Sequence, residues 1–425
     1  MKSNRERQIE ELRNSLINGE FEAAHGEAAD ETVDEGIIGE FLSGFGSYKH
    51  HDFIAHVPNG ILDSAEYCGY LYGIARRDTE KFYVIEAANE KYPQIGYITN
   101  ENSTVPSDAQ IEFIITRGVD GAKCETTDAQ TVRIKPYDEQ VKLFSRNSGL
   151  LESALMLNKR AVIIGCGAVG SFIAMQLARS GVGKFVLCDT DTLEIHNICR
   201  HQCGFDDLGR YKVDAIRGKI LNINPKAEIV TFKDPIQRVP KDALLPLLGC
   251  DSILIGAGDN RDSSRYACDS LAIPAGASFV AACCWTRAFA GEVVYWTSGK
   301  GLPCYNCALG DLVDSPEEVE RELSRINYFA SDADEASLSF EPGIAVDIDF
   351  ISIVATKIIL DLLNKNTPGY TPRVISHLSQ LTWICNTNEP KIGGEKAGIF
   401  SRPLQITQKV SFAKKTAHCP VCDSA

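Results

Sequence analysis

Residues 160–191 read RAVIIGCGAVGSFIAMQLARSGVGKFVLCDTD, and the fold class can be predicted from this segment. The apolar run AVII leads directly into a turn with glycine at positions 165, 167 and 170, and an apolar helical segment follows. Glycines at these points allow a tight turn and let backbone amides approach a phosphate at the N-terminus of the helix. The next apolar run ends at Asp189, 19 residues after Gly170, where a carboxylate can accept hydrogen bonds from ribose hydroxyls. The pattern predicts a nucleotide site without saying which nucleotide binds.

Apolar strands are expected further along the chain at residues 251–258, 277–282 and 291–296, with helical stretches between them. Such alternation is typical of a parallel α/β sheet. We therefore predict an α/β fold with a Rossmann-like, mostly parallel sheet for residues 160–425. Upstream, we expect an acidic helical or disordered leader at 1–45, a separate α+β domain at 46–137 and a helical connector at 138–159.

The composition of the chain argues against nucleic-acid-binding, membrane-spanning and disulfide-bonded secreted proteins. The net charge of −14 over 425 residues argues against a nucleic-acid partner, because phosphate neutralisation needs a basic face. No apolar run approaches the ~18 residues of a membrane span, and no secretion signal follows the charged N-terminus. Fifteen cysteines in such a chain indicate thiols and metal ligands rather than disulfides. These features predict a cytoplasmic protein that contacts neither membranes nor nucleic acid.

Basic and acidic residues beyond Asp189 favour ATP chemistry over nicotinamide chemistry. Arg200 and Lys212 follow the acidic strand end, and Asp259 and Asn260 follow the strand at 251–258. In adenylation a carboxylate attacks the α-phosphate while pyrophosphate leaves, so charge builds on phosphate oxygens. Fixed cationic donors and a magnesium ion stabilise that charge. Asp259 is placed to hold the magnesium, just past the C-terminal end of a strand.

Residues 140–425 resemble the family of ubiquitin-activating, thiamine-sulfur-carrier and molybdopterin-synthase adenylyltransferases, the ThiF- and MoeB-like family. The shared pattern is Gly-x-Gly-x-x-Gly, Asp-x-Asp, an Asn-x-x-Arg-Gln-like step, a following lysine and an Asp-Asn pair. Here His201 interrupts the Arg-Gln step. The resemblance implies ATP-dependent adenylation of the C-terminal carboxylate of a ubiquitin-like protein, with ATP and magnesium bound at one site.

The resemblance also assigns roles to residues of this chain. Asn197, Arg200 and Lys212 would contact the phosphates. Arg146, in Phe144-Ser145-Arg146-Asn147, resembles the family's arginine that reaches the ATP of the other subunit, which implies a homodimer. The expected catalytic residues are therefore Arg200, Lys212, Asp259 and Arg146. The expected cofactor-binding residues are Gly165, Gly167, Gly170, Asp189, Asp191, Asn197, Arg200, Lys212, Asp259 and Asn260.

Two Cys-x-x-Cys pairs predict a second metal site. Cys304 and Cys307 form the first pair, and Cys419 and Cys422 form the second, 112 positions further on. Four thiolates in two short turns suit a tetrahedral zinc ion. Four protein ligands leave no position open for water, so the zinc is expected to be structural.

A cysteine that members of this family often carry, to take the activated acyl group as a thioester, has no counterpart here. No cysteine lies between Cys307 and Cys385. Cys283, Cys284 and Cys385 follow apolar strands and are expected to be buried structural thiols. We therefore expect adenylation with direct transfer of the acyl group to an acceptor. The nearest analogues are members that stop at the acyl-adenylate, including the microcin-modifying peptide adenylyltransferases.

The N-terminal domain resembles a JAB-type isopeptidase. That family holds a catalytic zinc with His-x-His, seven residues and Ser-x-x-Asp. The corresponding positions here are Tyr97, Thr99, Ser107 and Gln110, of which only the serine matches. Without imidazole and carboxylate ligands no catalytic zinc is expected. The resemblance implies an inactive relative kept for packing or for binding a ubiquitin-like partner; an unrelated β-rich domain is the alternative.

Three alternatives to the ubiquitin-like substrate remain. A peptide-modifying, microcin-type adenylyltransferase would share the chemistry and differ in its substrate. An NAD-binding oxidoreductase would tolerate mutation of Arg200, Lys212 and Asp259. A non-catalytic scaffold would keep the fold without turnover.

Overall fold

The computed structural model describes residues 53–86, 92–101, 103–106, 111–119, 121–309, 342–408 and 419–422. The chain divides into two compact units, Met1–Glu139 and Gln140–Ala425. The predicted leader at 1–45 lies outside the described residues, as do Ser107 and Gln110. No helix in the described ranges is long and apolar enough to cross a membrane.

The N-terminal unit is built on a seven-stranded sheet in the order β6-β5-β4-β2-β3-β1-β7. Alternate residues such as Ala55 and Val57 point into its apolar core, while the neighbouring Ile54 and His56 are partly exposed. Its described helices are α3 (Asn59–Asp63) and the 3-10 turn η1 (Arg77–Thr79). The strands are β1 (Phe53–Pro58), β2 (Gly69–Arg76), β3 (Lys81–Val84), β4 (Gln94–Asn100), β5 (Phe113–Gly118), β6 (Gly121–Thr126) and β7 (Val132–Tyr137).

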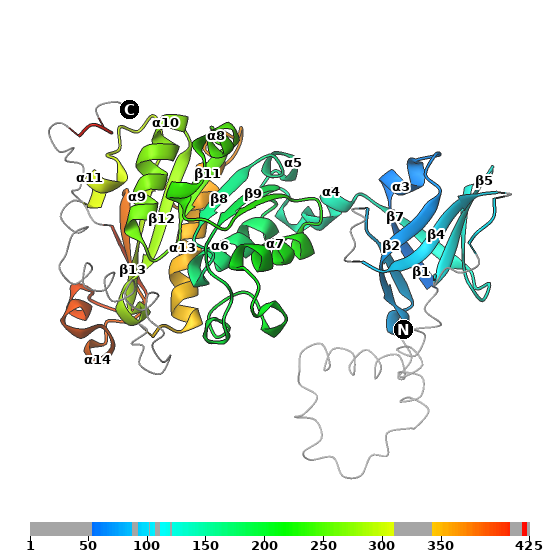
Figure 1. Ribbon diagram of the computed structural model, residues 1–425, viewed down its shortest axis with the longest axis horizontal. Coiled ribbons are helices and arrows are strands. Elements are labelled where there is room, and N and C mark those ends of the chain that lie inside the picture. Colours follow the sequence, from blue (N-terminus) through cyan, green and yellow to red (C-terminus); the bar gives the residue numbers. More distant parts are fainter. Residues whose placement is uncertain are drawn as a thin grey trace, which may run out of the picture. The chain divides into compact units, whose positions relative to one another are not determined.

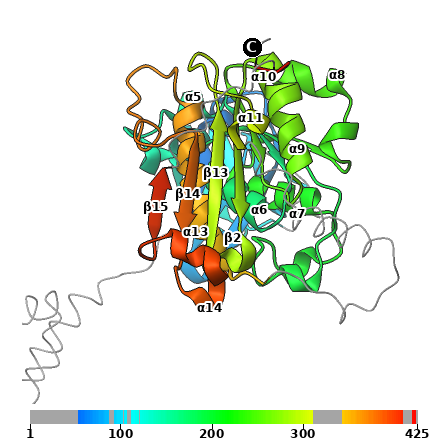
Figure 2. The same ribbon diagram turned by 90° about the vertical axis from the view of Figure 1, so that its left-hand side faces the viewer.

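The C-terminal unit has an eight-stranded sheet in the order β10-β9-β8-β11-β12-β13-β14-β15. Neighbours from β10 to β12 pair in parallel, and those from β12 to β15 pair antiparallel. The predicted mostly parallel α/β fold is thus confirmed, with an antiparallel extension at one side (Figure 2). The strands are β8 (Arg160–Ile164), β9 (Lys184–Cys188), β10 (Glu228–Phe232), β11 (Ser252–Gly256), β12 (Ser278–Cys284), β13 (Ala290–Trp296), β14 (Leu381–Cys385) and β15 (Gln405–Gln408).

Helices cover both faces of this sheet (Figure 1). In β8, Ala161 and Ile163 pack into the core beneath α6 (Ala168–Arg179), α7 (Lys212–Ile223) and α13 (Ala345–Leu363). Val162 and Ile164 pack into the opposite core, beneath α8 (Lys241–Leu244), α9 (Arg261–Tyr266) and the π-helix η7 (Ala267–Ala272). Burial of both faces explains why the parallel strands read as continuous apolar runs rather than alternating ones.

Short helical elements complete the unit. The stretch predicted as a helical connector contains α4 (Glu139–Leu143), η2 (Ser145–Asn147) and α5 (Ser153–Met156). The helix α14 lies at one end of the antiparallel strands and α11 at the other (Figure 2). The remaining elements are η3 (Ile195–Asn197), η4 (Phe205–Asp207), η5 (Ile236–Arg238), η6 (Leu245–Leu247), α10 (Ile273–Ala275), η8 (Thr286–Ala288), α11 (Tyr305–Leu309), α14 (Pro390–Gly393) and η11 (Gly394–Ile399).

Candidate functional site

The glycine-rich turn joins β8 to α6, and each of its glycines meets a different environment. Gly165 has φ +92°, and a Cβ there would come within 2.5 Å of the Gly258 nitrogen. A Cβ on Gly170 would collide with the carbonyl oxygen of Gly165, so helix and turn can pack this closely only through glycine. A Cβ on Gly167 would meet nothing within 4 Å. The turn is therefore tight on its protein side and open at Gly167, where a phosphate could approach.

Asp189 ties the turn to the end of β9. Its carboxylate accepts the Cys166 N–H at 2.6 Å and the Asp191 N–H at 2.8 Å. Burial raises the pKa of Asp189, and the nearby Lys212 ammonium opposes that rise. Each carboxylate oxygen still has a lone pair available for a hydroxyl donor. Asp189 is thus held in place by the backbone and remains able to bind a ribose.

Lys212 begins α7 and lies beside the same strand end. Its ammonium forms an ion pair with Asp191 at 2.8 Å. The lysine side chain is only 11% exposed, whereas that of Asp191 is 49% exposed. The backbone also closes here, through a bridge between Thr192 and Tyr211. The two ends of the loop between β9 and α7 therefore lie side by side, and Lys212 lies where they meet.

The loop between β9 and α7 carries Asn197 and Arg200. The Asn197 side-chain oxygen accepts the Glu194 N–H at 3.0 Å, which leaves its amide N–H groups as the donors available to a ligand. Arg200 is half-buried on the same loop. Asp207 anchors the loop by accepting from Arg210 at 2.7 Å and from Lys219 at 2.9 Å. Asp207 was not identified from sequence, since its partners are set by the folded loop.

Asp259 and Asn260 follow β11, next to the glycine-rich turn. Asp259 is exposed, and its loop contacts the turn through Gly258 and Gly165. The Asn260 side-chain oxygen accepts the N–H groups of Asp262 at 2.7 Å and Ser263 at 3.2 Å, so Asn260 is the N-cap of α9. The structure thus shows Asn260 as a capping residue, and its cofactor contact stays a prediction.

Cys284 ends β12 at the same edge of the sheet. Burial raises its pKa to about 12, with Asp259 adding to the shift and Arg200 opposing it. The thiol therefore lies within the electrostatic reach of Asp259 and Arg200, two of the predicted catalytic residues. Cys283 and Cys284 are half-buried, not buried as predicted, while Cys385 is buried. A protonated thiol is a poor nucleophile, so the raised pKa does not favour Cys284 as the site of a thioester.

Arg146 lies away from this edge. It is exposed on η2, and the neighbouring Asn147 donates from its side chain to the carbonyl of Arg179 at 2.9 Å. Arg179 ends α6, whereas the glycine-rich turn begins it. Twelve helical residues separate the two ends by about 18 Å. The structure therefore does not bring Arg146 together with the other predicted catalytic residues of its own chain.

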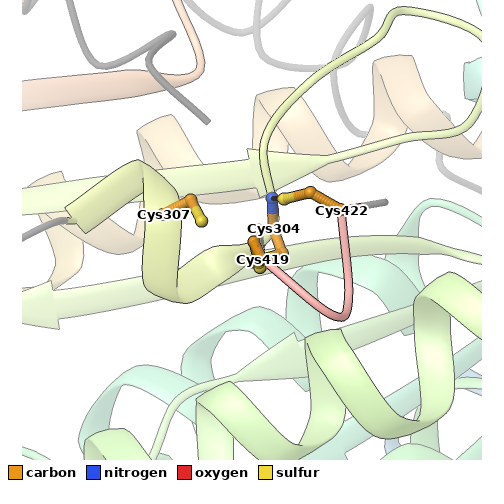
Figure 3. A group of neighbouring side chains, drawn as sticks. All are labelled: Cys304, Cys307, Cys419 and Cys422. Carbon is orange, nitrogen blue, oxygen red and sulfur yellow. Dashed lines mark hydrogen bonds between the residues drawn. The ribbon is translucent and has the colours of Figure 1, made fainter. Parts of the chain in front are cut away.

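The four cysteines of the two Cys-x-x-Cys pairs form one cluster (Figure 3). Their sulfur atoms all lie within 4.8 Å of one another, and the Sγ atoms of Cys304 and Cys419 are 3.8 Å apart. Sulfurs bound tetrahedrally at ~2.3 Å from one ion would be about 3.8 Å apart, so the cluster fits a zinc ion. No other group of at least three potential metal-ligating side chains occurs among the described residues.

The cysteine cluster lies at the other edge of the sheet. It packs against Ile273, in the helix that precedes β12, whereas Cys284 ends that strand. Seven strand residues separate the two edges by roughly 20 Å. A metal ion held there can fasten the C-terminal segment Cys419–Cys422 to α11 but cannot touch a nucleotide at the glycine-rich turn.

A family model described as "ThiF family" matches residues 137–387, more than half of the chain. The chain belongs to the ThiF family. This ThiF protein is 38% identical over 94 residues to a tRNA threonylcarbamoyladenosine dehydratase of Bacillus subtilis, covering 21% of the chain and 37% of the relative. It is 26% identical over 189 residues to the molybdopterin-synthase adenylyltransferase of Salmonella typhimurium, covering 43% of the chain and 70% of that relative.

A third relative is ubiquitin-like modifier-activating enzyme 5 of Caenorhabditis elegans, with 28% identity over 219 residues, 48% of the chain and 49% of the relative. The chain therefore spans less than half of the length of the Bacillus subtilis and Caenorhabditis elegans relatives. Among solved structures, Escherichia coli MccB with MccA-N7isoASN aligns with a TM-score of 0.46 and 20% identity, over 64% of this chain and 69% of that one.

Proposed function

We propose that this ThiF protein adenylates the C-terminal carboxylate of a ubiquitin-like protein. A carboxylate oxygen attacks the α-phosphorus of ATP, the bond to the bridging oxygen breaks, and pyrophosphate leaves. The observation that carries the proposal is the meeting of three loops at one edge of the sheet. These loops are the glycine-rich turn, the Gly258–Asn260 segment and the loop based on Asp191 and Lys212. They would present backbone amides, a cation and carboxylates to one nucleotide.

Each residue has a distinct part in this proposal. The open side of Gly167 receives a phosphate, and Asp189 accepts from the ribose. Lys212 exchanges its Asp191 partner for phosphate oxygens when ATP arrives, while Arg200 and Asn197 donate from the loop. These fixed donors stabilise the charge that develops on the α-phosphate as the carboxylate attacks.

The proposal includes two metal ions. An exposed carboxylate at a strand end is the ligand type that magnesium prefers, so Asp259 would hold magnesium, which neutralises phosphate charge when bound. The four-cysteine cluster would hold a structural zinc. The fifteen cysteines, none of which forms a disulfide, support a cytoplasmic setting, where thiols stay reduced.

A peptide is the second candidate substrate, favoured by a specific observation. The segment from Cys307 to Cys385 contains no cysteine between these two, and the Cys284 thiol has a raised pKa. Both features support an enzyme that stops at the acyl-adenylate and passes the acyl group directly to an acceptor. The N-terminal unit, as an inactive JAB-like domain, would favour a ubiquitin-like partner instead.

The proposal also includes a homodimer. Arg146 is exposed and lies at the end of α6 far from the glycine-rich turn of its own chain. An arginine that serves catalysis from that position must reach the site of a second copy. Mixing Arg146→Ala with Asp259→Ala protein would then restore activity that neither variant has alone, because a mixed dimer contains one intact site.

ATP–pyrophosphate exchange tests the proposal. The purified protein is assayed with small β-grasp proteins that end in glycine, with short precursor peptides, and with tRNA, since the name of one relative includes a tRNA nucleoside. Exchange that depends on a ubiquitin-like protein supports the main proposal, and exchange that depends on a peptide supports the second. Binding of NAD in place of ATP would refute both, and ATP binding without exchange in any mixture would indicate a scaffold.

A further inference from the structure

His201 interrupts the Arg-Gln step of the family pattern, and its imidazole is engaged on both sides. Nδ1 accepts the backbone N–H of Cys203 at 3.1 Å, and Nε2 lies 2.7 Å from the carbonyl oxygen of Cys166. Since the Cys203 N–H can only donate, Nδ1 must be unprotonated, and Nε2 must carry the hydrogen that Cys166 accepts. The residue His201 is 8% exposed. The structure thus requires a neutral imidazole in one tautomer.

The bond to Cys166 connects the two halves of the proposed phosphate site, whereas the bond from Cys203 orients the ring within its own loop. Cys166 is the central residue of the glycine-rich turn, and Arg200 directly precedes His201 on the loop from β9 to α7. The next residue, Gln202, donates its N–H to the Ser171 hydroxyl at 3.3 Å, which fastens the same loop to the first turns of α6. The position of Arg200 relative to the turn therefore depends on the ring of His201.

We propose that His201 is a positioning residue for nucleotide binding, whose neutral ring holds Arg200 against the glycine-rich turn and whose protonation releases it. The inference rests on the proposed function, since Arg200 is taken to bind phosphate. A proton added at Nδ1 would face the Cys203 N–H, and the bond that orients the ring would be replaced by repulsion between two donors. The ring would then turn away from Cys203, and Nε2 would no longer be held at the Cys166 carbonyl. The phosphate site should therefore loosen in acid.

The surroundings of the ring favour its neutral form. Burial lowers the pKa of His201, the hydrogen bond to Cys166 opposes this, the Lys212 ammonium lowers the pKa further, and Asp207 raises it. Cys166 and Cys203, whose backbones bond to the ring, have thiol pKa values raised by burial and stay uncharged. Because the pKa in the folded protein lies below the unfolded value of about 6.5, the contribution of His201 is complete above that pH. It is lost as pH falls through the folded pKa.

The experiment compares ATP binding by calorimetry from about pH 5 to about pH 8 for wild type, His201→Gln and His196→Gln. Glutamine has an acceptor and a donor, but on a flexible chain that holds the two partners less firmly than the ring does, and it does not titrate. His196 lies on the same loop with an exposed side chain beside Glu194, so His196→Gln is the matched control. We expect His201→Gln to bind ATP at least about tenfold more weakly than wild type at pH 7.5. The difference should shrink in acid, while the control follows wild type throughout.

Taking the ratio of variant to wild-type affinity at each pH cancels the titration of ATP itself. A constant ratio near one would overturn the inference. A second readout uses the wild type alone: ring-nitrogen NMR of the imidazoles should show His201 as the Nε2–H tautomer with a pKa below the ordinary value, and an Nδ1–H tautomer or an ordinary pKa would refute it. Because neither measurement needs the carboxylate substrate, absence of pyrophosphate exchange would count against the proposed function and not against this inference.

Discussion

Two alanine substitutions in the glycine-rich turn should separate stability from nucleotide binding. In Gly165→Ala the new Cβ would occupy a residue with φ +92° and lie 2.5 Å from the Gly258 nitrogen. The backbone strain costs about 1–2 kcal/mol, and relief of the contact costs about 1–3 kcal/mol more. At roughly 2–4 °C per kcal/mol, the melting temperature of the C-terminal unit should fall by about 4–20 °C.

The second substitution, Gly167→Ala, adds the same methyl group where it meets nothing within 4 Å. The fold should lose about 1 kcal/mol or less, because alanine is a poorer N-cap than glycine at the start of α6. If the open side of Gly167 receives a phosphate, however, the methyl group displaces one or two charge-assisted hydrogen bonds. Each is worth about 1.5–3 kcal/mol, so the ATP affinity should fall at least about tenfold.

Differential scanning calorimetry and ATP titration on the two variants form the assay. Gly204→Ala is the control, since a Cβ there also meets nothing within 4 Å, and the glycine has a negative φ. Wild-type ATP affinity in Gly167→Ala would refute the placement of the phosphate. An unchanged melting temperature in Gly165→Ala would refute the close contact between the turn and the Asp259 loop.

Three further predictions concern the rest of the C-terminal unit. Asp259→Ala should lower pyrophosphate exchange at least about a hundredfold with an unchanged melting temperature. The control is Asp242→Ala, which changes another exposed aspartate and should keep the wild-type exchange rate. A wild-type exchange rate in Asp259→Ala would exclude the assigned role. Cys304→Ser should reduce zinc content and the melting temperature more than it reduces ATP binding. Cys250→Ser, outside the cluster, should change none of these three quantities. Unchanged zinc content in Cys304→Ser would refute the zinc site. Asp361→Asn should lower the free energy of unfolding of the C-terminal unit by about 2–4 kcal/mol at pH 7, as measured by urea unfolding. Equal free energies of unfolding for variant and wild type at pH 7 would contradict this prediction.

The Asp361 prediction also has a pH dependence with a definite sign. Burial opposes ionisation, but hydrogen bonds from the Tyr370 hydroxyl and from the N–H groups of Arg373, Val374 and Ile375 outweigh it and lower the pKa of Asp361. A carboxylate with a lowered folded pKa stabilises the protein above its unfolded pKa of about 3.9 and loses that effect as pH falls through the folded pKa. The stability difference between wild type and Asp361→Asn should therefore shrink in acid.

The glycine-rich turn and the cysteine pairs were readable from sequence because their information is local. Three glycines and one aspartate at fixed offsets specify strand, turn, helix and strand, and the structure contains them as β8, α6 and β9. The Cys-x-x-Cys spacing likewise specifies two turns that can share an ion, and the four sulfurs do cluster. In both cases the residues that define the motif are close together in the sequence.

Contacts between segments distant in sequence could not be read in this way. The antiparallel direction of β13, β14 and β15 depends on how each strand returns along the sheet, and an apolar run does not record it. Asp361 resembles a surface aspartate of a helix until the backbone of residues 373–375 folds onto it. The capping role of Asn260, by contrast, had a local signal, since asparagine directly before a helical segment is a preferred N-cap.

His201 shows why the motif alone does not determine the site. The motif predicts that Arg200 binds phosphate, but it does not indicate which contacts hold this loop residue against the glycine-rich turn. In this chain the contact is made by a residue that departs from the family pattern, through the carbonyl of Cys166 rather than through the nucleotide. The second bond of the ring, from the Cys203 N–H to Nδ1, exists only while the ring is neutral, so the departure introduces a titratable group into the site. A family motif therefore identifies which residues meet the nucleotide, whereas the pH range over which they stay in place follows from the neighbours that the motif does not specify.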